Sequence, residues 1–492
     1  MMRRSQRLVD LARVVVGMLW AMANASYILG QAVPANPLLA ANPSASNQTS
    51  GLQMGWAAVD ITPRAGTAMA GYYSRRDATG VHDPLWSKAI VLSDGSQLVA
   101  IVSLDLISTT MPVVAEARKL IREQTGIAED AVMISATHSH TGPMLSSGSK
   151  RTALFGGLDD EAMTYMAQLA ERIAESVKQA KGALQPVILK SGTEEERQLA
   201  FNRRFFLRDG SVGWNPGKLN SKIVREAGPT DDRLHVLGVF SPKQEPLGVM
   251  ANFSIHLDTV GGTEWSADVP YTVQDSLQKV FGTSFFVHYT TGCCGDVNHI
   301  DVRTAMAQKG HGEAARIGLR LASAALRSWP KLQTVPSGTL RFERNVVQLS
   351  SDSIAPERVE WAHQVVSTLQ QKKSPAPKFM ELVEAFKVID IDERKGEPWS
   401  CEVQVITLGN DVAWVSLPGE IFVQLGMMIK DGSPFPMTMV HELANGSLGY
   451  IPTSQAFAQG NYEVVSSRVA QGSGEKLVET ALASLRRLYR PE

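Results

Sequence analysis

Cysteine is scarce in this sequence, and net charge is nearly absent. Only three cysteines occur among 492 residues, Cys293, Cys294 and Cys401, which argues against a fold held together by disulfides. The adjacent pair favours two buried thiols over a strained vicinal disulfide, and without a second pair it does not predict a cysteine-type zinc site. Lys plus Arg (48) and Asp plus Glu (49) nearly cancel, so no overall field attracts nucleic acid. We therefore expect no nucleic-acid partner.

The N-terminus differs in character from the rest of the chain. A basic start that includes Arg3, Arg4 and Arg7 precedes a mostly apolar stretch over 8–30, and small residues follow near Ala32. This order predicts a secretory signal peptide over 1–32, with an uncleaved membrane anchor as the alternative. Residues 33–50 are rich in Ala, Asn, Ser and Pro and predict a flexible linker. We expect export to the periplasm or the extracellular space, with membrane association through the N-terminus if the anchor is retained.

The remaining residues predict a mixed α/β fold. Short apolar runs rich in β-branched residues indicate strands over 98–106, 131–136, 234–240, 248–256 and 284–289. Apolar residues spaced three and four apart indicate helices over 111–125, 159–184 and 312–329. Residues 401–407 and 412–417 flank a turn and indicate a hairpin. The expected fold class is α/β, a mixed-sheet core flanked by helices in a single large catalytic domain over 51–492. The oligomeric state stays open.

Two histidines follow the predicted strand 131–136. His138 and His140 are separated by one residue, and Gly142-Pro143 ends the extended segment. In extended backbone such a pair points to the same side, and strand ends are where ligand sites of α/β sheets concentrate. Imidazole suits zinc, so the pair is a candidate metal site. A hydrogen-bonded polar turn is the alternative.

Two further candidates stand at the ends of other apolar runs. His256 ends the run 248–256, and Glu420 follows a Pro-Gly corner after 412–417. Taken alone, His256 is better explained as a buried, hydrogen-bonded histidine. Taken alone, Glu420 is better explained as the first-turn acid of a helix over 421–429. Each is a metal ligand only if the fold brings it to the histidine pair.

The order of these segments and the residues in them resemble the neutral/alkaline non-lysosomal ceramidase family. Residues 55–63 read GWAAVDITP, 69–72 read MAGY, and 135–143 read SATHSHTGP, each similar to a family segment in the same order. Further similar segments are Asn202-Arg203, residues 252–256 (NFSIH), 417–420 (LPGE), 450–453 (YIPT) and 461–463 (NYE). The resemblance spans about residues 51–470, and its HxH segment is the most specific piece.

The resemblance implies a zinc-dependent hydrolase in which an activated water attacks an amide or ester carbonyl. Four side chains would bind Zn²⁺: His138, His256, Glu420 and Tyr450. Three others would act beside the metal: His140, Arg203 and Tyr462. Carboxylates that would orient the imidazoles are Asp60, Asp105 and Asp268. Residues 202–208 and Trp265 would rim the opening.

The segment TGCCGDVNHI at 291–300 departs from the family pattern. Asn298 stands where the family presents a serine to the substrate amide, and a carboxamide cannot act as a hydroxyl of that kind. Asn298 can still position a polar substrate, and His299 adds a titratable group. The sequence continues for about thirty residues after Tyr462, so we expect it to lack the C-terminal β-sandwich domain of the ceramidases. We therefore expect a non-ceramide substrate: a small molecule, a lipid amide or a glycan-linked compound. The alternatives are a zinc enzyme acting on a carbohydrate or other polar substrate, and a non-catalytic binding relative.

Overall fold

The structure, a computed structural model, describes residues 51–490. The predicted signal segment 1–32 and linker 33–50 lie outside the described residues. The described residues form one compact unit. Among the described residues, no helix has the length and apolar character needed to cross a membrane.

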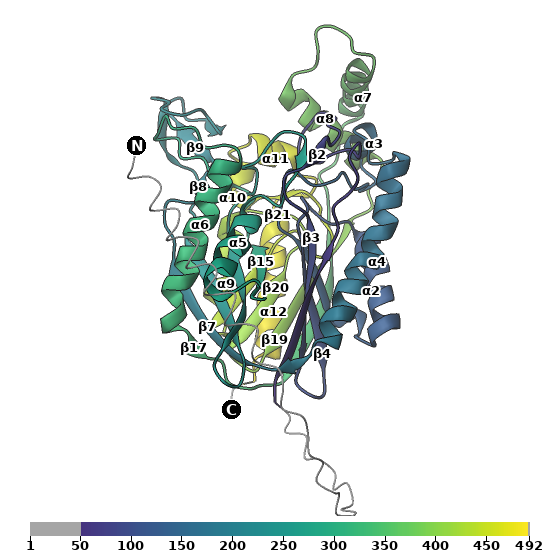
Figure 1. The fold of residues 1–492 in the computed structure, drawn as a ribbon. Coiled ribbons are helices and arrows are strands. Elements are labelled where there is room, and N and C mark those ends of the chain that lie inside the picture. The colour runs from purple at the N-terminus through teal and green to yellow at the C-terminus, as the bar shows by residue number, and fades with distance from the viewer. Residues whose placement is uncertain (1–50, 491–492) are drawn as a thin grey trace, which may run out of the picture. The chain divides into compact units, whose positions relative to one another are not determined.

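The first sheet has the strand order β5-β4-β3-β1-β6. Its inner strands β1, β3 and β4 are antiparallel, whereas β5 runs parallel to β4. Its strands are β1 (Gln53–Asp60), β3 (Trp86–Ser93), β4 (Leu98–Leu104), β5 (Val132–Ala136) and β6 (Gln185–Pro186). Helix α4 (Asp160–Gly182) packs on β1 and β3, and α2 (Met111–Thr125) packs on α4 (Figure 1). Leu169, Ile173 and Val177 of the predicted apolar stripe of α4 are buried, whereas Met163 near its start is exposed.

The second sheet has the order β15-β13-β12-β7-β17, with β13 and β15 parallel and the other neighbours antiparallel. Its strands are β7 (Ile188–Glu195), β12 (Arg233–Phe240), β13 (Pro246–Phe253), β15 (Phe286–Thr291) and β17 (Gln333–Thr334). Helices α5 (Val269–Phe281) and α6 (His311–Ser328) pack on this sheet, and the short helix η2 (Trp329–Lys331) follows α6.

The third sheet has the order β18-β19-β20-β22. Its strands are β18 (Leu340–Leu349), β19 (Trp399–Leu408), β20 (Val412–Ser416) and β22 (Met437–His441). Helices α9 (Val423–Gly432) and α12 (Ser473–Leu488) pack on this sheet and on each other. Strand β15 of the second sheet contacts β4 and β5 of the first and β22 of the third, so the three sheets meet around β15.

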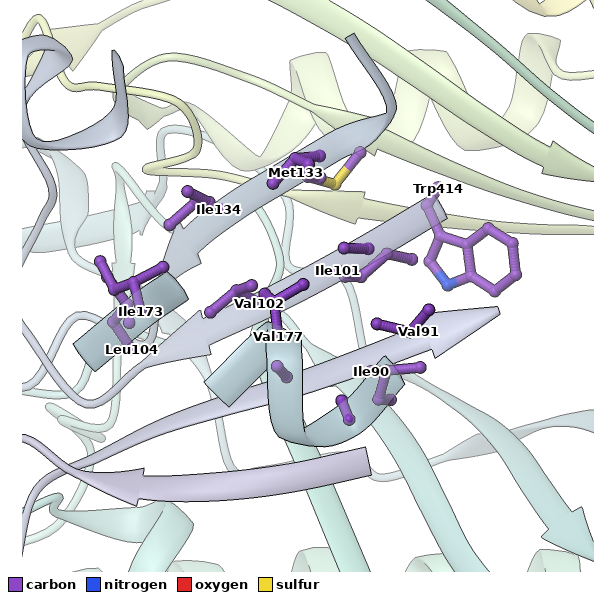
Figure 2. Packing of buried hydrophobic residues seen from close by; sticks show 14 of the residues in the cluster. Ile90, Val91, Ile101, Val102, Leu104, Met133, Ile134, Ile173, Val177 and Trp414 are labelled. Atoms are coloured by element: carbon purple, nitrogen blue, oxygen red, sulfur yellow. The ribbon is translucent and has the colours of Figure 1, made fainter. Parts of the chain in front are cut away.

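The largest hydrophobic cluster lies where these sheets meet. Figure 2 shows side chains of β3, β4 and β5, among them Ile101 and Met133, close to Ile173 and Val177 of α4 and to Trp414 of β20. Trp414 is fully buried. This shared core holds the first and third sheets together and so fixes the positions of the loops that leave their strands.

The remaining helices and strands lie outside these three sheets. The helices are η1 (Glu129–Ala131), α3 (Lys150–Leu154), α7 (Pro356–Gln370), α8 (Phe379–Asp392), α10 (Ser454–Phe457) and α11 (Tyr462–Ser466). The strands are β2 (Gly80–Val81), β8 (Phe201–Asn202), β9 (Arg204–Leu207), β10 (Val212–Trp214), β11 (Ile223–Glu226), β14 (Glu264–Trp265), β16 (Val297–Asn298), β21 (Glu420–Ile421) and β23 (Tyr450–Ile451). Figure 1 shows the α7–α8 hairpin at the top of the view, where α3 and α11 also lie, and α8 contacts both.

The predicted class, a mixed α/β core flanked by helices, is confirmed. Helix α2 spans the predicted range, and the hairpin predicted around residues 409–411 is β19–β20, with Leu408 paired to Val412. Two boundaries were wrong near the candidate site. Strand β13 ends at Phe253, three residues before His256, and α9 begins at Val423 rather than at 421. In both cases the chain leaves regular structure just where a polar side chain is presented.

Candidate metal and active site

The histidine pair lies directly after β5, but its backbone differs from the prediction. His138 has φ 74°, in the left-handed region, so the extended geometry expected for the pair is wrong. The His138 N–H donates to the Leu106 carbonyl (2.8 Å), and the His140 N–H donates to the Leu257 carbonyl (3.3 Å). These bonds join the loop after β5 to the chain after β4 and after β13. The turn at His138 still directs both rings to one place.

Three imidazoles converge in a buried cluster. His256 Nε2 lies 3.1 Å from His138 Nε2 and 3.1 Å from His140 Nε2. His138, His140 and His256 are the group of three buried side chains whose donor atoms can reach a common ion. Glu420 joins them, with Oε2 3.4 Å from His138 Nε2. The segments that carry these side chains follow strands of three different sheets.

The tautomer of His138 follows from its second contact. His138 Nδ1 lies 2.7 Å from the Ile107 carbonyl, which can only accept, so Nδ1 carries a proton. Burial alone would lower the pKa of His138, but Glu420 raises it, so without a metal Nε2 can hold a second proton toward that carboxylate. In the neutral ring, Nε2 presents a lone pair. That lone pair faces His256 Nε2 and the Glu420 carboxylate. Acceptors crowded at such distances repel one another unless a cation or a proton lies between them. The cluster therefore fits a bound cation.

The protonation states of Glu420 and His256 also favour a bound cation. Burial alone would raise the pKa of Glu420, but hydrogen bonds from His138 and Tyr450 and the charge of Arg203 lower it to about 2. Burial lowers the pKa of His256 well below its ordinary value, and neighbouring cationic groups lower it further. An ionised carboxylate beside a neutral imidazole is the protonation state that metal ligands require.

Glu420 and Tyr450 are placed by a short ladder. Strands β21 and β23 are parallel, and Glu420 is the register partner of Tyr450. The Tyr450 hydroxyl hydrogen-bonds to the Glu420 carboxylate. The alternative in which Glu420 opens a helix is wrong, because α9 starts three residues later. All four predicted ligands, His138, His256, Glu420 and Tyr450, are thus brought to one buried place.

Arg203 is held against this group by a buried ion pair. Its Nε donates to Glu463 (2.9 Å), and a second guanidinium nitrogen donates to the Gly295 carbonyl (2.7 Å). The other Glu463 oxygen accepts from Arg204 (2.7 Å). The Arg203 guanidinium lies 5.4 Å from the centre of the Tyr450 ring. Glu463 therefore anchors two buried arginines and leaves Arg203 facing the proposed ligand Tyr450.

Tyr462 lies at the first position of α11 and lines a cavity of about 60 Å³ together with His138, His140 and Glu420. Its ring centre is 5.4 Å from that of Tyr450 and 4.4 Å from that of Trp214. Phe379 of α8 stacks on Tyr462 at 5.5 Å. The predicted position of Tyr462 beside the metal ligands agrees with this arrangement, and the α7–α8 hairpin supplies part of its packing.

Asn298 has a different setting from the one predicted. Its amide nitrogen donates to Asn215 (3.1 Å), and its oxygen accepts from the Ile300 N–H (3.0 Å). It does not line either cavity that contains His138 and Glu420. His299 Nε2 pairs with the Gln308 carbonyl (2.8 Å). Both side chains bond inside the protein, although His299 Nδ1 is buried without a partner, and the structure does not join Asn298 to the group around the histidines.

The carboxylates predicted to orient the imidazoles do not contact them. Asp60 accepts from Thr62, Asp105 from Trp86, and Asp268 from the backbone at the start of α5. Trp265, predicted at the rim, is fully buried. These predictions were wrong, because an aspartate at a strand end or helix start is more readily used by nearby backbone N–H groups.

Sequence reasoning missed two acids that do lie beside the histidines. Asp258, two residues after His256, has Oδ1 3.7 Å from His140 Nδ1 and accepts from the Tyr72 hydroxyl at 2.8 Å. Glu442 accepts from the Cys294 thiol (2.7 Å) and the Ile421 N–H (2.9 Å). The position of Asp258 next to a candidate ligand was the available signal. The three cysteines are free and buried, as predicted.

A second group of possible ligands lies elsewhere on the surface, formed by His82, Asp83 and His311. The rings of His82 and His311 are stacked, with centres 3.5 Å apart and planes inclined by 10°. Imidazole lone pairs lie in the ring plane, so two stacked rings do not point to a common ion. Of these two groups, the buried histidine cluster is the one whose donor atoms point to a common ion.

Comparison with known proteins agrees with the resemblance drawn from the motifs. Residues 52–264 match the family described as neutral/alkaline non-lysosomal ceramidase, N-terminal. The matched region is less than half of the 492 residues, and through it the chain is similar to this family. The neutral ceramidase of Pseudomonas aeruginosa is 27% identical over 212 residues, which are 42% of this chain and 30% of that relative.

Solved ceramidase structures share the fold over most of the chain. A structure described as ceramidase complexed with C2 has a TM-score of 0.68 and 18% identity. The neutral ceramidase from Pseudomonas aeruginosa has a TM-score of 0.67 and 17% identity, and in each case the match covers 90% of this chain and 76% of the other. The ceramidase family region contains His138, His140, Arg203 and His256, whereas Glu420 and Tyr450 lie beyond it.

Proposed function

We propose that this protein is a zinc-dependent hydrolase of amide bonds. The observation that carries the proposal is the convergence of His138, His140 and His256 nitrogens with the Glu420 carboxylate in a buried cluster. The similarity of residues 52–264 to the ceramidase family supports amide hydrolysis, and the nitrogen and oxygen donors suit Zn²⁺. We further propose that the N-terminal segment 1–32 directs export.

The residues present fit a divalent ion. His138, His256, Glu420 and Tyr450 would hold it, with the proton of His138 on Nδ1 and its Nε2 free. Zinc in such a site supplies a Lewis acid that polarises a carbonyl and lowers the pKa of water. The Tyr450 hydroxyl is already bonded to Glu420, so the donors are arranged before any ion binds.

The other side chains of the site have separate tasks. Burial lowers the pKa of His140 to about 4, so its ring is neutral near pH 7 and can accept a proton from water at a ring nitrogen. Arg203, fixed by Glu463, provides a cation near the carbonyl to be cleaved. Tyr462 provides a phenol hydroxyl on the opposite wall. Donors placed in this way stabilise an oxyanion by on the order of 3–4 kcal/mol each.

The alternative function is a zinc enzyme acting on a carbohydrate or another polar substrate. It is favoured by the cavities of about 90 and 60 Å³ beside the histidines, which are lined by hydroxyls and arginines as well as apolar groups.

Metal analysis tests the proposal directly. Purified wild-type protein should contain about one zinc ion per chain, and His138→Ala or His256→Ala should remove it. His299→Ala is the matched control, because this buried histidine bonds to Gln308 and should keep the metal. Zinc-dependent release of acyl groups from N-acyl compounds should disappear with the metal. Wild-type protein that binds no divalent metal would contradict the proposal, and metal binding without turnover of any amide would indicate a binding relative.

A further inference from the structure

Arg151, a partly buried arginine, differs from Arg203, Arg204 and Arg468 near the site. It belongs to α3 and lines both cavities that contain His138 and Glu420. Within residues 51–490 its guanidinium makes no hydrogen bond and no ion pair, and its Nε is buried without a partner. The centre of the Tyr73 ring lies 4.9 Å from the guanidinium carbon.

Three neighbouring arginines have a carboxylate, and a fourth, Arg76, donates to backbone carbonyls, including that of His140. Arg203 and Arg204 share Glu463, and Arg468, which lines the same two cavities, pairs with Asp390 at 2.6 Å. A buried charge without a counterion is costly, and a protein keeps one where a ligand supplies the missing partner. Burial lowers the pKa of Arg151, but the surrounding acidic groups outweigh that effect and raise it, so the side chain stays cationic.

Two unpaired hydroxyls line the same cavity of about 90 Å³. Thr109 and Thr110 are 1% and 5% exposed, and neither hydroxyl has a hydrogen-bond partner among the described residues. Thr110 is the N-cap residue of α2, yet its side chain makes no capping bond. The first turn of α2 contains no acidic residue, so the partial positive charge of the helix start is not neutralised there. A cation, two hydroxyl donors and the positive start of a helix all favour a negatively charged ligand.

We propose that this cavity is a subsite for an oxyanion group of the substrate, bound by Arg151, Thr109 and Thr110 next to the bond that is cleaved. The planar guanidinium matches the paired oxygens of carboxylate, phosphate or sulfonate. The substrate class is then an N-acyl compound that carries an acidic group close to its amide. This inference rests on the proposed amide hydrolase for its substrate, but not for the binding of the anion.

Anion binding tests the subsite without turnover. Inorganic phosphate, sulfate and acetate are titrated into the zinc-loaded full chain, and the dissociation constant and Tm are measured. We expect Arg151→Met to weaken binding by about 10–100-fold, and Thr110→Val by several-fold. Arg122→Met is the control, because this arginine lies in the last turn of α2 and pairs with Glu129. Equal anion affinity in the wild type and in Arg151→Met would overturn the proposal.

A purely structural role for Arg151 predicts a different result. If Arg151 only supports the fold, Arg151→Met lowers the Tm in anion-free buffer. If Arg151 is an unpaired ligand group, the variant keeps or raises the Tm of the anion-free protein and loses the stabilisation that anions give to the wild type. A lowered Tm with unchanged stabilisation by anions would contradict the subsite.

Matched substrates identify the anion. N-acylglycine, N-acyltaurine and N-acylphosphoethanolamine carry carboxylate, sulfonate and phosphate, and N-acylethanolamine with the same chain is the neutral reference. The wild type should prefer one acidic substrate, and Arg151→Met should lower that preference in kcat/KM by about 10–100-fold, mainly through KM. A wild type that favours the neutral amide would overturn the subsite. A wild type that cleaves none of them while still binding anions through Arg151 would count against the hydrolase alone.

Discussion

Glu420 and Tyr450 are direct register partners in the parallel ladder of β21 and β23. The pairing brings together two side chains from segments on either side of α9 and β22. Because backbone hydrogen bonds join the two segments, the carboxylate and the phenol are positioned by the main chain as well as by their own hydrogen bond. Such positioning by rigid backbone is what a metal site needs to select a coordination geometry.

The two tyrosines of the site should respond differently to loss of the hydroxyl. Tyr450→Phe removes a proposed ligand that bonds to Glu420, so we expect zinc affinity to fall by at least about 10-fold. Tyr462→Phe should keep one zinc per chain and lower kcat. Zinc titration followed by steady-state kinetics checks both. Equal zinc affinities in the two variants would remove Tyr450 from the ligand set.

The shared carboxylate of Glu463 should be important for stability. Glu463 is fully buried, and Glu463→Gln leaves Arg203 and Arg204 without their counterion. We expect the free energy of unfolding in urea to fall by about 3–5 kcal/mol. Glu175→Gln, which alters an exposed pair with Lys178, should change it by less than about 1 kcal/mol. Similar losses of unfolding free energy in both variants would show that the buried ion pair stabilises the fold no more than the exposed pair.

The ion pair between Asp231 and Lys430 should make stability depend on pH in the acid range. Both side chains are buried, 3.0 Å apart. Burial alone would raise the pKa of Asp231, but Lys430 and Arg233 outweigh it and hold the pKa well below its ordinary value. A depressed folded-state pKa stabilises the fold above the unfolded value of about 3.9, and this contribution is lost as pH falls below that value.

Asp231→Asn should therefore cost about 3–5 kcal/mol near pH 7, and the cost should shrink as pH falls below about 4. Chemical denaturation of the wild type and the variant across this range measures the difference. Asp431→Asn is the control, because Asp431 is 63% exposed and pairs with the same Arg233. A cost for Asp231→Asn that does not change with pH would contradict this assignment.

Gly55 stands at a close approach between β1 and α4. A Cβ at this position would overlap the Ala180 carbonyl oxygen and lie 2.8 Å from the Leu184 nitrogen, both of which are backbone atoms. We expect Gly55→Ala to lower the free energy of unfolding by at least about 1–3 kcal/mol, because backbone must move. Gly182→Ala, at the last residue of α4 and with open space around it, should be nearly neutral. Equal Tm values for the two variants would show that the contact relaxes easily.

The buried elements could be predicted from sequence because their patterns are local. The apolar runs of β4, β5 and β12 and the stripe of α2 each contain the information that places them in a sheet or a helix. The chain between these elements carries no such pattern. His138 in left-handed backbone and Glu420 in a two-residue strand depend on contacts with segments distant in the chain. Their convergence came from the family resemblance and not from periodicity.

The polar neighbours of the histidines were the least predictable part. Asp105 and Asp268 are aspartates at conspicuous positions, yet nearby backbone N–H groups take their oxygens. Asp258 reaches His140 because the loop after β13 bends back, which no local rule indicates. Asn298 was expected in the site, but its two bonds to Asn215 and Ile300 hold it elsewhere. A single sequence shows which side chains could bind a metal or orient a ligand. The fold determines which of them lie close together.

Because the donors of the cluster follow strands of different sheets, the metal site is a property of the whole folded unit. A fragment that ends at residue 264 would retain the three imidazoles, yet it would lack both the carboxylate of Glu420 and the phenol of Tyr450. Zinc uptake should thus appear late in refolding, after the third sheet has docked, and its rate would report on assembly of the complete chain.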